Sequence, residues 1–366
     1  MRVSGYFTGV AGRSFHLDGS GNQPEETKVV FDQHNLRTFE RRLDYVKSGG
    51  GPIHISAITQ YREFLDLVPR GKPFALQLCF SDPHRVYDKD AIPEPHDPNK
   101  IKLPAHYPDT PGVRADFANY YDEISRFDGN FGQVLDELKK RGLAENTLVA
   151  FMGDNGAAQF RGKGTLYEYG VNVPLLVRWP GQVKAGRVSS DLVSGEDLAP
   201  TFLEACGLKP LKEMTGRSFL KLLRSDASYA PRQYVFAERG AHGSGLPNGT
   251  SPFDLGRVAI GQRYKLIYNA LWQLPYQPVD FAGQPFWKEL QQMHTDGKLS
   301  PLMSRLYFSP TRRMFELFDL EADPNEFNNL IGSKDQESIE RELKAKLQEW
   351  MILERDFLPL PVPPNQ

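Results

Sequence analysis

Cysteine and long hydrophobic runs are both scarce in this chain of 366 residues. Its two cysteines, Cys79 and Cys206, are too few for a disulfide framework, although a single bond remains an alternative. Cys79 lies in an apolar run and Cys206 near an expected helix end, which favours buried thiols. No apolar stretch is long enough to span a bilayer, so we expect no membrane partner.

An excess of charge of either sign is also missing. Lys and Arg number 44 against 46 Asp and Glu, which gives a net charge of −2. A chain without a basic excess is not expected to bind nucleic acid, and any attraction for an anion must be local. The first residues also lack the basic head, apolar run and small-residue cleavage site of a secretory signal.

What the chain does contain is an ordinary globular composition, with 40% hydrophobic and 25% charged residues. Apolar runs at 72–80, 148–152 and 173–177 predict buried strands. Apolar residues recur every three to four positions over 113–141 and predict a helix, and a second helix is expected over 196–205. Prolines throughout 82–112 exclude a helix there and predict a long loop. This α/β order favours a parallel sheet with covering helices.

The pattern changes beyond residue 230. Short alternating runs at 234–237, 257–260, 264–268 and 315–318 are typical of antiparallel strands, and a charged helix follows over 336–351. We therefore expect a catalytic α/β domain over 1–230, an antiparallel subdomain over 231–355 and a proline-rich tail over 356–366.

The most informative stretch is 151–181, FMGDNGAAQFRGKGTLYEYGVNVPLLVRWPG. Asp154 and Asn155 follow a buried strand, and ligands of open α/β sheets bind at such strand ends. A carboxylate beside an amide carbonyl suits calcium or magnesium better than zinc. Lys163 lies between two glycines and suggests an anionic substrate. Taken alone, Asp-Asn-Gly is equally typical of a simple turn.

The order of three segments resembles the sulfatase family, within the alkaline phosphatase superfamily. They are Asp-Asn-Gly, Lys-Gly-Thr-Leu-Tyr-Glu, and Gly-Val-x-Val-Pro-Leu-Leu-Val-Arg-Trp-Pro-Gly. The resemblance implies a parallel-rich sheet flanked by helices and a smaller C-terminal antiparallel subdomain. Asp-Pro-His-Arg at 82–85 and the segment 103–111 are similar to the heparan N-sulfatase branch, which implies sulfated sugars or glycans as substrates.

The resemblance also implies roles for individual residues. Asp154 and Asn155 match two ligands of one divalent cation, with calcium expected and magnesium the alternative. Lys163 matches a lysine that contacts the sulfate and the bridging oxygen, and His84 matches a histidine that assists the leaving group. Without that context, His84 reads as an ordinary loop histidine.

Four further residues are weaker candidates. Arg13 and His16 stand where many sulfatases have Gly-Lys-x-His, but one extra residue separates them. Arg85, with Arg114, is a candidate to reach an acidic sugar, and a solvated face is the alternative for both. The remaining histidines share no ligand spacing and are expected to be structural or on the surface; they are His34, His54, His96, His106, His242 and His294.

The nucleophile of the family is missing from this sequence. Sulfatases use a formylglycine made from the first residue of Cys-x-Pro-Ser-Arg, and neither Cys79 nor Cys206 begins that motif. There is also no Asp-Asp doublet for the other metal ligands. The resemblance places Gly5 to Gly9 well inside the catalytic domain. We therefore expect a C-terminal part of a sulfatase, with little turnover of its own.

Two alternatives remain from the sequence. One is a non-catalytic protein that binds anions or sugars, and the other is a phosphomonoesterase or phosphodiesterase of the same superfamily. Sulfatases are commonly periplasmic, secreted or lysosomal, but no segment of this chain indicates a compartment.

Overall fold

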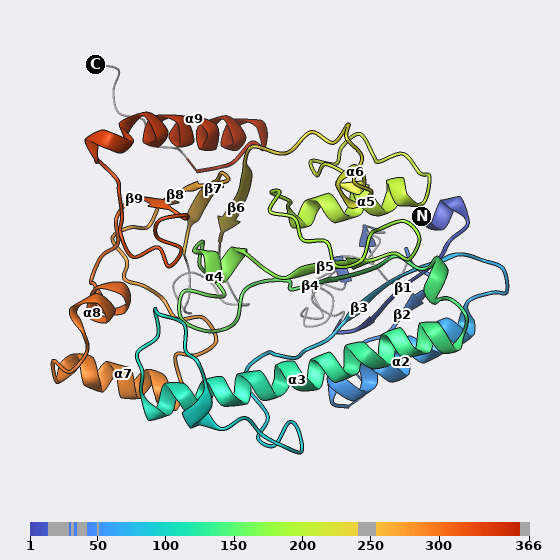
Figure 1. The fold of residues 1–366 in the computed structure, drawn as a ribbon, viewed down its shortest axis with the longest axis horizontal. Helices are drawn as coiled ribbons and strands as arrows, with labels where there is room; N and C mark the ends of the chain where they lie inside the picture. The colour runs from blue at the N-terminus through green and yellow to red at the C-terminus, as the bar shows by residue number, and fades with distance from the viewer. Residues whose placement is uncertain (14–28, 31–32, 35–41, 50, 241–253, 359–366) are drawn as a thin grey trace.

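The computed structural model describes residues 1–13, 29–30, 33–34, 42–49, 51–240 and 254–358, which form a mixed α/β structure. Within these ranges, three sheets lie above a long helix, α3 (Pro111–Lys140), which passes beneath the whole molecule in Figure 1. The α/β class predicted from the sequence is confirmed. The proposed division at residue 230 falls between α6 (Leu220–Leu223) and β6 (Val235–Arg239) and stays a prediction.

The first sheet is parallel, as the predicted fold class requires, but only one of the three predicted strands, that at 72–80, belongs to it. It has the order β2-β1-β3, formed by β1 (Phe7–Gly12), β2 (Tyr45–Val46) and β3 (Phe74–Cys79). Helix α2 (Ile53–Leu67) packs closely on it, because the Phe64 ring lies over Gly9, where a Cβ would come within 2.5 Å of Cε2. The C-terminal half of α3 completes this core with Val134 and Leu138.

One strand pair differs from the predicted parallel arrangement. β4 (Val149–Met152) and β5 (Leu175–Arg178) form a separate antiparallel pair. A parallel return needs a crossover, usually a helix of several turns. The connection between these strands contains only α4 (Glu168–Val171), so the chain folds back beside β4 in the opposite direction.

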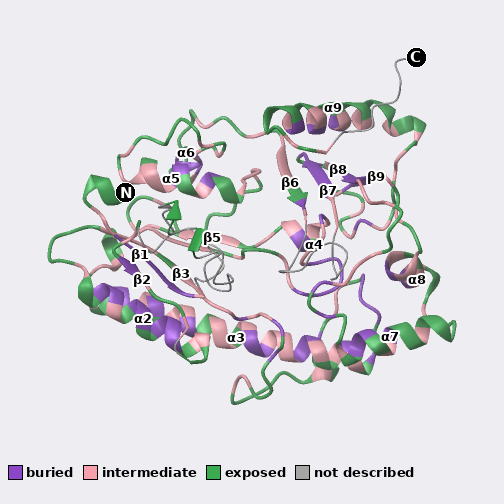
Figure 2. Ribbon diagram, turned by 180° about the vertical axis from the view of Figure 1, so that it is seen from behind, coloured by how far each residue is buried: buried purple, intermediate pink, exposed green. Residues whose placement is uncertain are grey.

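The third sheet is antiparallel, and this prediction is confirmed. Its order is β6-β7-β8-β9, with β7 at Gly256–Ile260, β8 at Tyr264–Asn269 and β9 at Phe315–Asp319. Helix α9 (Glu337–Leu353) covers it and buries Leu343, Leu347 and Met351, on the face that Figure 2 colours purple.

The predicted helix over 113–141 is α3, which starts two residues earlier. Thr110 caps it by accepting a hydrogen bond from the Val113 amide at 3.2 Å, and Pro111 occupies the first turn. Its N-terminal half packs on two helices that the sequence did not predict, α7 (Pro285–Thr295) and α8 (Pro301–Phe308), around Phe160. α3 therefore contributes to the core beneath the first sheet and to the core around Phe160.

The remaining elements are short. The predicted helix at 196–205 is the 3-10 turn Gly195–Asp197 followed by α5 (Leu198–Ala205). The predicted loop at 82–112 contains the 3-10 turn Pro98–Lys100 and ends two residues early, where α3 begins at Pro111. Other 3-10 turns are Arg2–Ser4, Ala144–Asn146 and Lys334–Gln336. No helix within the described ranges combines the length and apolar character required to cross a membrane.

Candidate active site

Three of the predicted site residues meet where strands end. Arg13 follows β1, His84 follows β3, and Lys163 lies in the loop between β4 and β5. Arg13 Nη2 and Lys163 Nζ each lie 3.4 Å from His84 Nε2. Two cationic groups and one imidazole therefore share a small volume at one end of the sheets.

The close approach of β1 and β3 fixes where Arg13 leaves the sheet. The Arg13 amide donates to the Cys79 carbonyl at 2.9 Å. Gly12 has a φ of 82°, and a Cβ there would lie 1.9 Å from the same carbonyl oxygen. Only glycine fits this position, so Gly12 and Cys79 together direct Arg13 toward His84.

The imidazole of His84 has a defined orientation. Its Nδ1 lies in hydrogen-bond contact with the Arg85 carbonyl, which can only accept, so we assign the proton to Nδ1. The Nε2 lone pair then faces Arg13 and Lys163. Burial lowers the pKa of His84, the two cations lower it further, and the Arg85 carbonyl and Asp280 oppose them. His84 is therefore neutral at neutral pH in this structure.

A fourth member of the site was not predicted. Asp280, from the segment between β8 and α7, accepts a hydrogen bond from Lys163 Nζ at 2.7 Å. The same oxygen, Oδ2, lies 3.8 Å from His84 Nε2. Asp280 is 117 positions from Lys163 in a region with no recognised motif, so only the tertiary fold could identify it.

Asp154 and Asn155 lie at the carboxyl end of β4, as predicted, and both are exposed. Burial raises the pKa of Cys79 at the end of β3, a hydrogen bond with Gln77 opposes the rise, and the charge of Asp154 adds to it. These are two hard oxygen ligands, whereas calcium takes roughly 6–8. Across the described ranges, no three His, Cys, Asp or Glu side chains form a metal-holding group. Among the described residues, Asp154 and Asn155 are therefore too few to hold such a cation by themselves.

Arg85 does not face the site, contrary to the expectation that it reaches a sugar. Its side chain is 3% exposed and forms a two-pronged ion pair with Asp116 on α3, at 2.7 and 2.6 Å. Its Nε also donates to the Ala158 carbonyl at 2.7 Å. Arg85 thus fastens the segment after His84 to α3 and to the loop after β4. Arg114 likewise pairs with Asp109.

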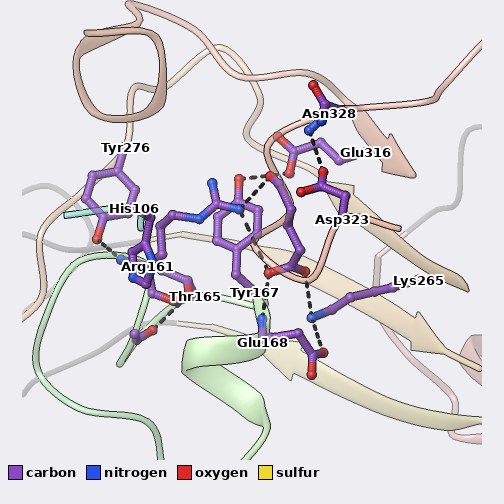
Figure 3. Close-up of polar contacts among 12 residues, drawn as sticks. His106, Arg161, Thr165, Tyr167, Glu168, Lys265, Tyr276, Glu316, Asp323 and Asn328 are labelled. Carbon is purple, nitrogen blue, oxygen red and sulfur yellow. Dashed lines mark hydrogen bonds and ion pairs between the residues drawn. The ribbon is translucent and has the colours of Figure 1, made fainter. Parts of the chain in front are cut away.

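A buried polar network holds the loop that carries Lys163. Lys265 on β8 is fully buried, and its Nζ contacts Glu168 Oε1 at 2.8 Å and Glu326 Oε1 at 2.9 Å (Figure 3). Glu326 Oε2 also accepts a hydrogen bond from the Glu168 amide at 2.8 Å. These contacts attach the C-terminal end of the loop to the antiparallel sheet.

The other end of the loop is attached through Arg161. Its Nη2 donates to the Glu326 carbonyl at 2.9 Å, and its guanidinium carbon lies 3.5 Å from the centre of the Tyr167 ring (Figure 3). The Tyr167 hydroxyl donates to Glu316 on β9 at 2.8 Å. The loop is therefore held in place on both sides of Lys163, which restricts the positions that its ammonium can take.

Three other histidines have structural surroundings. His106 is fully buried beside Tyr107 and Tyr169, and burial lowers its pKa to about 3, so it stays neutral. His96 contacts Asp122 at 2.6 Å, and His294 stacks on Phe308 with ring centres 4.4 Å apart. The predicted site residue His16, and also His242, lie outside the residues that the structure describes.

Comparisons with known proteins point to one family. The family profile described as Sulfatase matches residues 2–208, which include Arg13, His84 and Lys163. An ulvan-active sulfatase of Formosa agariphila is 31% identical over 264 residues, which are 72% of this chain and 42% of that protein. Human N-sulphoglucosamine sulphohydrolase is 30% identical over an alignment of 314 residues that covers 76% of this chain and 60% of that protein.

A solved structure shares the fold. It is of a protein in complex with its substrate D-glucosamine-2-N,6-O-disulfate, with a TM-score of 0.64 and 17% identity. The alignment covers 98% of this chain and 82% of that one. The present chain spans less than two thirds of the length of each of the two relatives compared by sequence. Asp280 and the antiparallel sheet lie beyond the residues that the family profile matches.

Proposed function

We propose that this chain, which belongs to the sulfatase family, binds the sulfate group of a sulfated sugar with Lys163, Arg13 and His84. The observation that supports this proposal most directly is the closeness of these residues, which follow three different strands. Arg13 Nη2 and Lys163 Nζ each lie 3.4 Å from His84 Nε2. A guanidinium and an ammonium are strong donors to an oxyanion, and a partly buried site strengthens both interactions.

Each residue has a distinct task in this proposal. Arg13 and Lys163 attract the sulfate oxygens and hold them in one orientation as charge moves toward the leaving atom. His84 is neutral before substrate binds, and an anion placed beside it favours its protonated form. The proton would then sit on Nε2, from which it can be donated to the departing sugar oxygen or nitrogen.

The chain offers candidate ligands for a cation but lacks the motif that yields the family's nucleophile. We propose Asp154 and Asn155 as two ligands of a divalent cation, calcium first and magnesium as the alternative, because both are exposed oxygen donors at a strand end. In the family such an ion supports a formylglycine nucleophile. The described ligands are incomplete and the sequence holds no Cys-x-Pro-Ser-Arg, so we assign no step to either group.

The names of the relatives support a sugar as the substrate. One is active on ulvan and the other acts on N-sulphoglucosamine. We propose sulfated sugars or glycans, with sulfate carried on oxygen or nitrogen. His16 stays a candidate for the sulfate site, whereas Arg85 is omitted because its guanidinium is occupied by Asp116.

Sulfate binding by the purified chain tests the proposal. Isothermal titration with inorganic sulfate and with glucosamine N-sulfate should give saturable binding. Lys163→Met should weaken both about 10- to 100-fold, since a charge-assisted hydrogen bond contributes ~1.5–3 kcal/mol. The matched control is Lys298→Met, because Lys298 is an exposed lysine paired with Asp296. Equal affinities for the two variants would overturn the assignment of Lys163.

Turnover gives a second measurement. Because the sequence lacks the motif that yields formylglycine, sulfate release by these 366 residues should stay near the uncatalysed rate even with calcium present. This outcome would also favour the non-catalytic binding alternative for the chain alone. Hydrolysis of a sulfate ester or sulfamate at ordinary enzymatic rates would contradict this expectation.

A further inference from the structure

Asp280 is an unusual neighbour for a site that binds an anion. Its Oδ2 lies 2.7 Å from the Lys163 ammonium and 3.8 Å from His84 Nε2, inside the group of side chains proposed to hold sulfate. A sulfate held by Lys163 and His84 would lie close to this carboxylate. The two negative groups would repel each other, and the repulsion grows where water is partly excluded. Its presence therefore requires a chemical reason beyond sulfate binding.

The backbone holds Asp280 firmly in this place. The residues on either side, Val279 and Phe281, are both buried. Phe281 packs against Phe160, with ring centres 5.4 Å apart. Val279 Cγ2 presses on Gly164, where an added Cβ would come within 2.3 Å of it. The segment is thus packed directly against the loop that carries Lys163.

The conformation of Asp280 also directs its side chain. Its φ is 65°, in the left-handed region that few residues other than glycine, Asn and Asp adopt readily. With both neighbours anchored in the core, this turn places the carboxylate on Lys163. The side chain stays 23% exposed, so a ligand can reach it from solvent.

The hydrogen-bonding chemistry narrows what Asp280 can recognise. An ionised carboxylate only accepts hydrogen bonds, and the oxygens of a sulfate monoester also only accept. Asp280 therefore cannot bond to the sulfate itself. In a sulfated substrate, its complementary partners are the O–H and N–H groups of the sugar beside the sulfated position.

Lys163 can serve both groups at once. An ammonium has three N–H donors, so it can keep one on Asp280 while offering another to the sulfate. The distance from Asp280 Oδ2 to His84 Nε2 leaves the carboxylate beside the atom proposed to face the leaving group. A sugar donor next to the departing atom would thus lie within reach of Asp280.

We propose, on the basis of the sulfate-binding function above, that Asp280 is a specificity-determining residue that accepts a hydrogen bond from the sugar next to its sulfated position. It would favour sulfated carbohydrates over sulfates that lack a neighbouring donor. Phenyl sulfate is an example of the disfavoured class. Inorganic sulfate, which also has no sugar donor, reports on the anion site alone.

Two variants separate this role from a structural one. Asp280→Asn and Asp280→Gly both accept a positive φ, so both should fold, which circular dichroism and thermal unfolding will check. Their affinities for glucosamine N-sulfate, phenyl sulfate and inorganic sulfate are measured by titration calorimetry on the whole chain. The useful quantity is the ratio of the sugar affinity to the phenyl sulfate affinity, because any shared change at Lys163 cancels.

We expect wild type to prefer glucosamine N-sulfate over phenyl sulfate, and Asp280→Gly to reduce that preference about tenfold. Asp280→Asn should reduce it less, because the amide retains one acceptor oxygen. Inorganic sulfate should bind both variants at least as tightly as wild type, since a negative charge is removed or neutralised.

Two other results would overturn the assignment. An equal gain for all three ligands would mean that Asp280 only repels anions, and an equal loss would mean that it only holds Lys163. The sulfate site itself is judged separately by Lys163→Met. If wild type bound none of the ligands, the proposed function would fail, whereas binding with an unchanged ratio would sink only the role of Asp280.

Discussion

His84 links the charge of the site to pH. Its pKa is lowered first by burial and then by Arg13 and Lys163. An anion bound between those cations offsets their effect and raises the pKa again. Binding should therefore take up a proton at His84.

The first prediction at this scale concerns the pH dependence of sulfate affinity. Between the lowered pKa of His84 and the higher pKa that it has beside bound sulfate, sulfate affinity should fall as pH rises. Calorimetry from pH 5 to pH 8 should show this trend, with proton uptake visible in buffers of different ionisation enthalpy. His84→Gln should bind with nearly constant affinity over that range. A wild-type affinity that rose with pH would contradict the assigned role.

Sequence reasoning identified some of these residues and missed others for definite reasons. Lys163 and His84 sit in short motifs, and their strand-end positions imply that they meet. Asp280 carries no local signal, because its role depends on the packing of Val279 and Phe281. The sugar-binding role expected for Arg85 was wrong, because its partner Asp116 lies on α3, 31 positions along the chain, and sequence alone does not pair the two.

At the scale of elements, the long loop after β3 depends on α3. Asp82, just before His84, pairs with Arg126 of α3 at 2.7 Å. Beside it, Glu123 accepts a hydrogen bond from the Asp88 amide at 2.8 Å. Burial raises the pKa of Glu123 to about 7, with the Asp82 and Asp88 charges adding to the effect. The loop that presents His84 thus rests on a carboxyl group that is costly to ionise.

Glu123→Gln tests this cost. Below about pH 4.5, Glu123 is protonated in both folded and unfolded chains, and its ionisation does not affect stability. As pH rises to about 7, the unfolded chain releases the proton first and the wild type loses stability. The variant should therefore be more stable than wild type at pH 8 by on the order of 1 kcal/mol, with the advantage vanishing near pH 4.

Urea unfolding at several pH values measures the difference. Glu145→Gln provides the control, because Glu145 is largely exposed in the turn before β4. A pH-independent difference between Glu123→Gln and wild type would show that Glu123 is not the titrating group.

The elements themselves were predictable to different degrees. α3 and the four strands of the antiparallel sheet have clear periodic patterns, and the structure confirms them. The predicted parallel direction of β4 and β5 was wrong, because a buried apolar strand has the same sequence pattern in either direction. Helices α7 and α8 were missed, although Pro285 and Ser300-Pro301 mark their starts.

For the whole molecule, the network around Lys265 matters most. It joins the antiparallel sheet to the loop that carries Lys163, so the distant sheet helps to set the geometry of the site. Removing one partner of a buried ion pair leaves the other charge uncompensated, which costs ~3–5 kcal/mol. Lys265→Met should destabilise the chain by about this amount.

Sulfate affinity should fall as well, because the loop loses one of its two anchors. The control is Lys346→Met on α9, an exposed lysine paired with Glu349, which should cost less than about 0.5 kcal/mol. Denaturant unfolding and sulfate titration of the same samples provide both measurements. A variant as stable as wild type with unchanged sulfate affinity would show that the network does not position Lys163.

The four site residues, Arg13, His84, Lys163 and Asp280, are spread along most of the chain. During synthesis the ribosome releases the two cations and His84 well before Asp280, Lys265 and Glu326 emerge. The charges of Arg13 and Lys163 are therefore present before the carboxylate that faces Lys163 and before the sheet that anchors its loop. Assembly of the site must wait until Asp280, Lys265 and Glu326 have been synthesised, and a ribosome that stalls near residue 240 would leave the site without them.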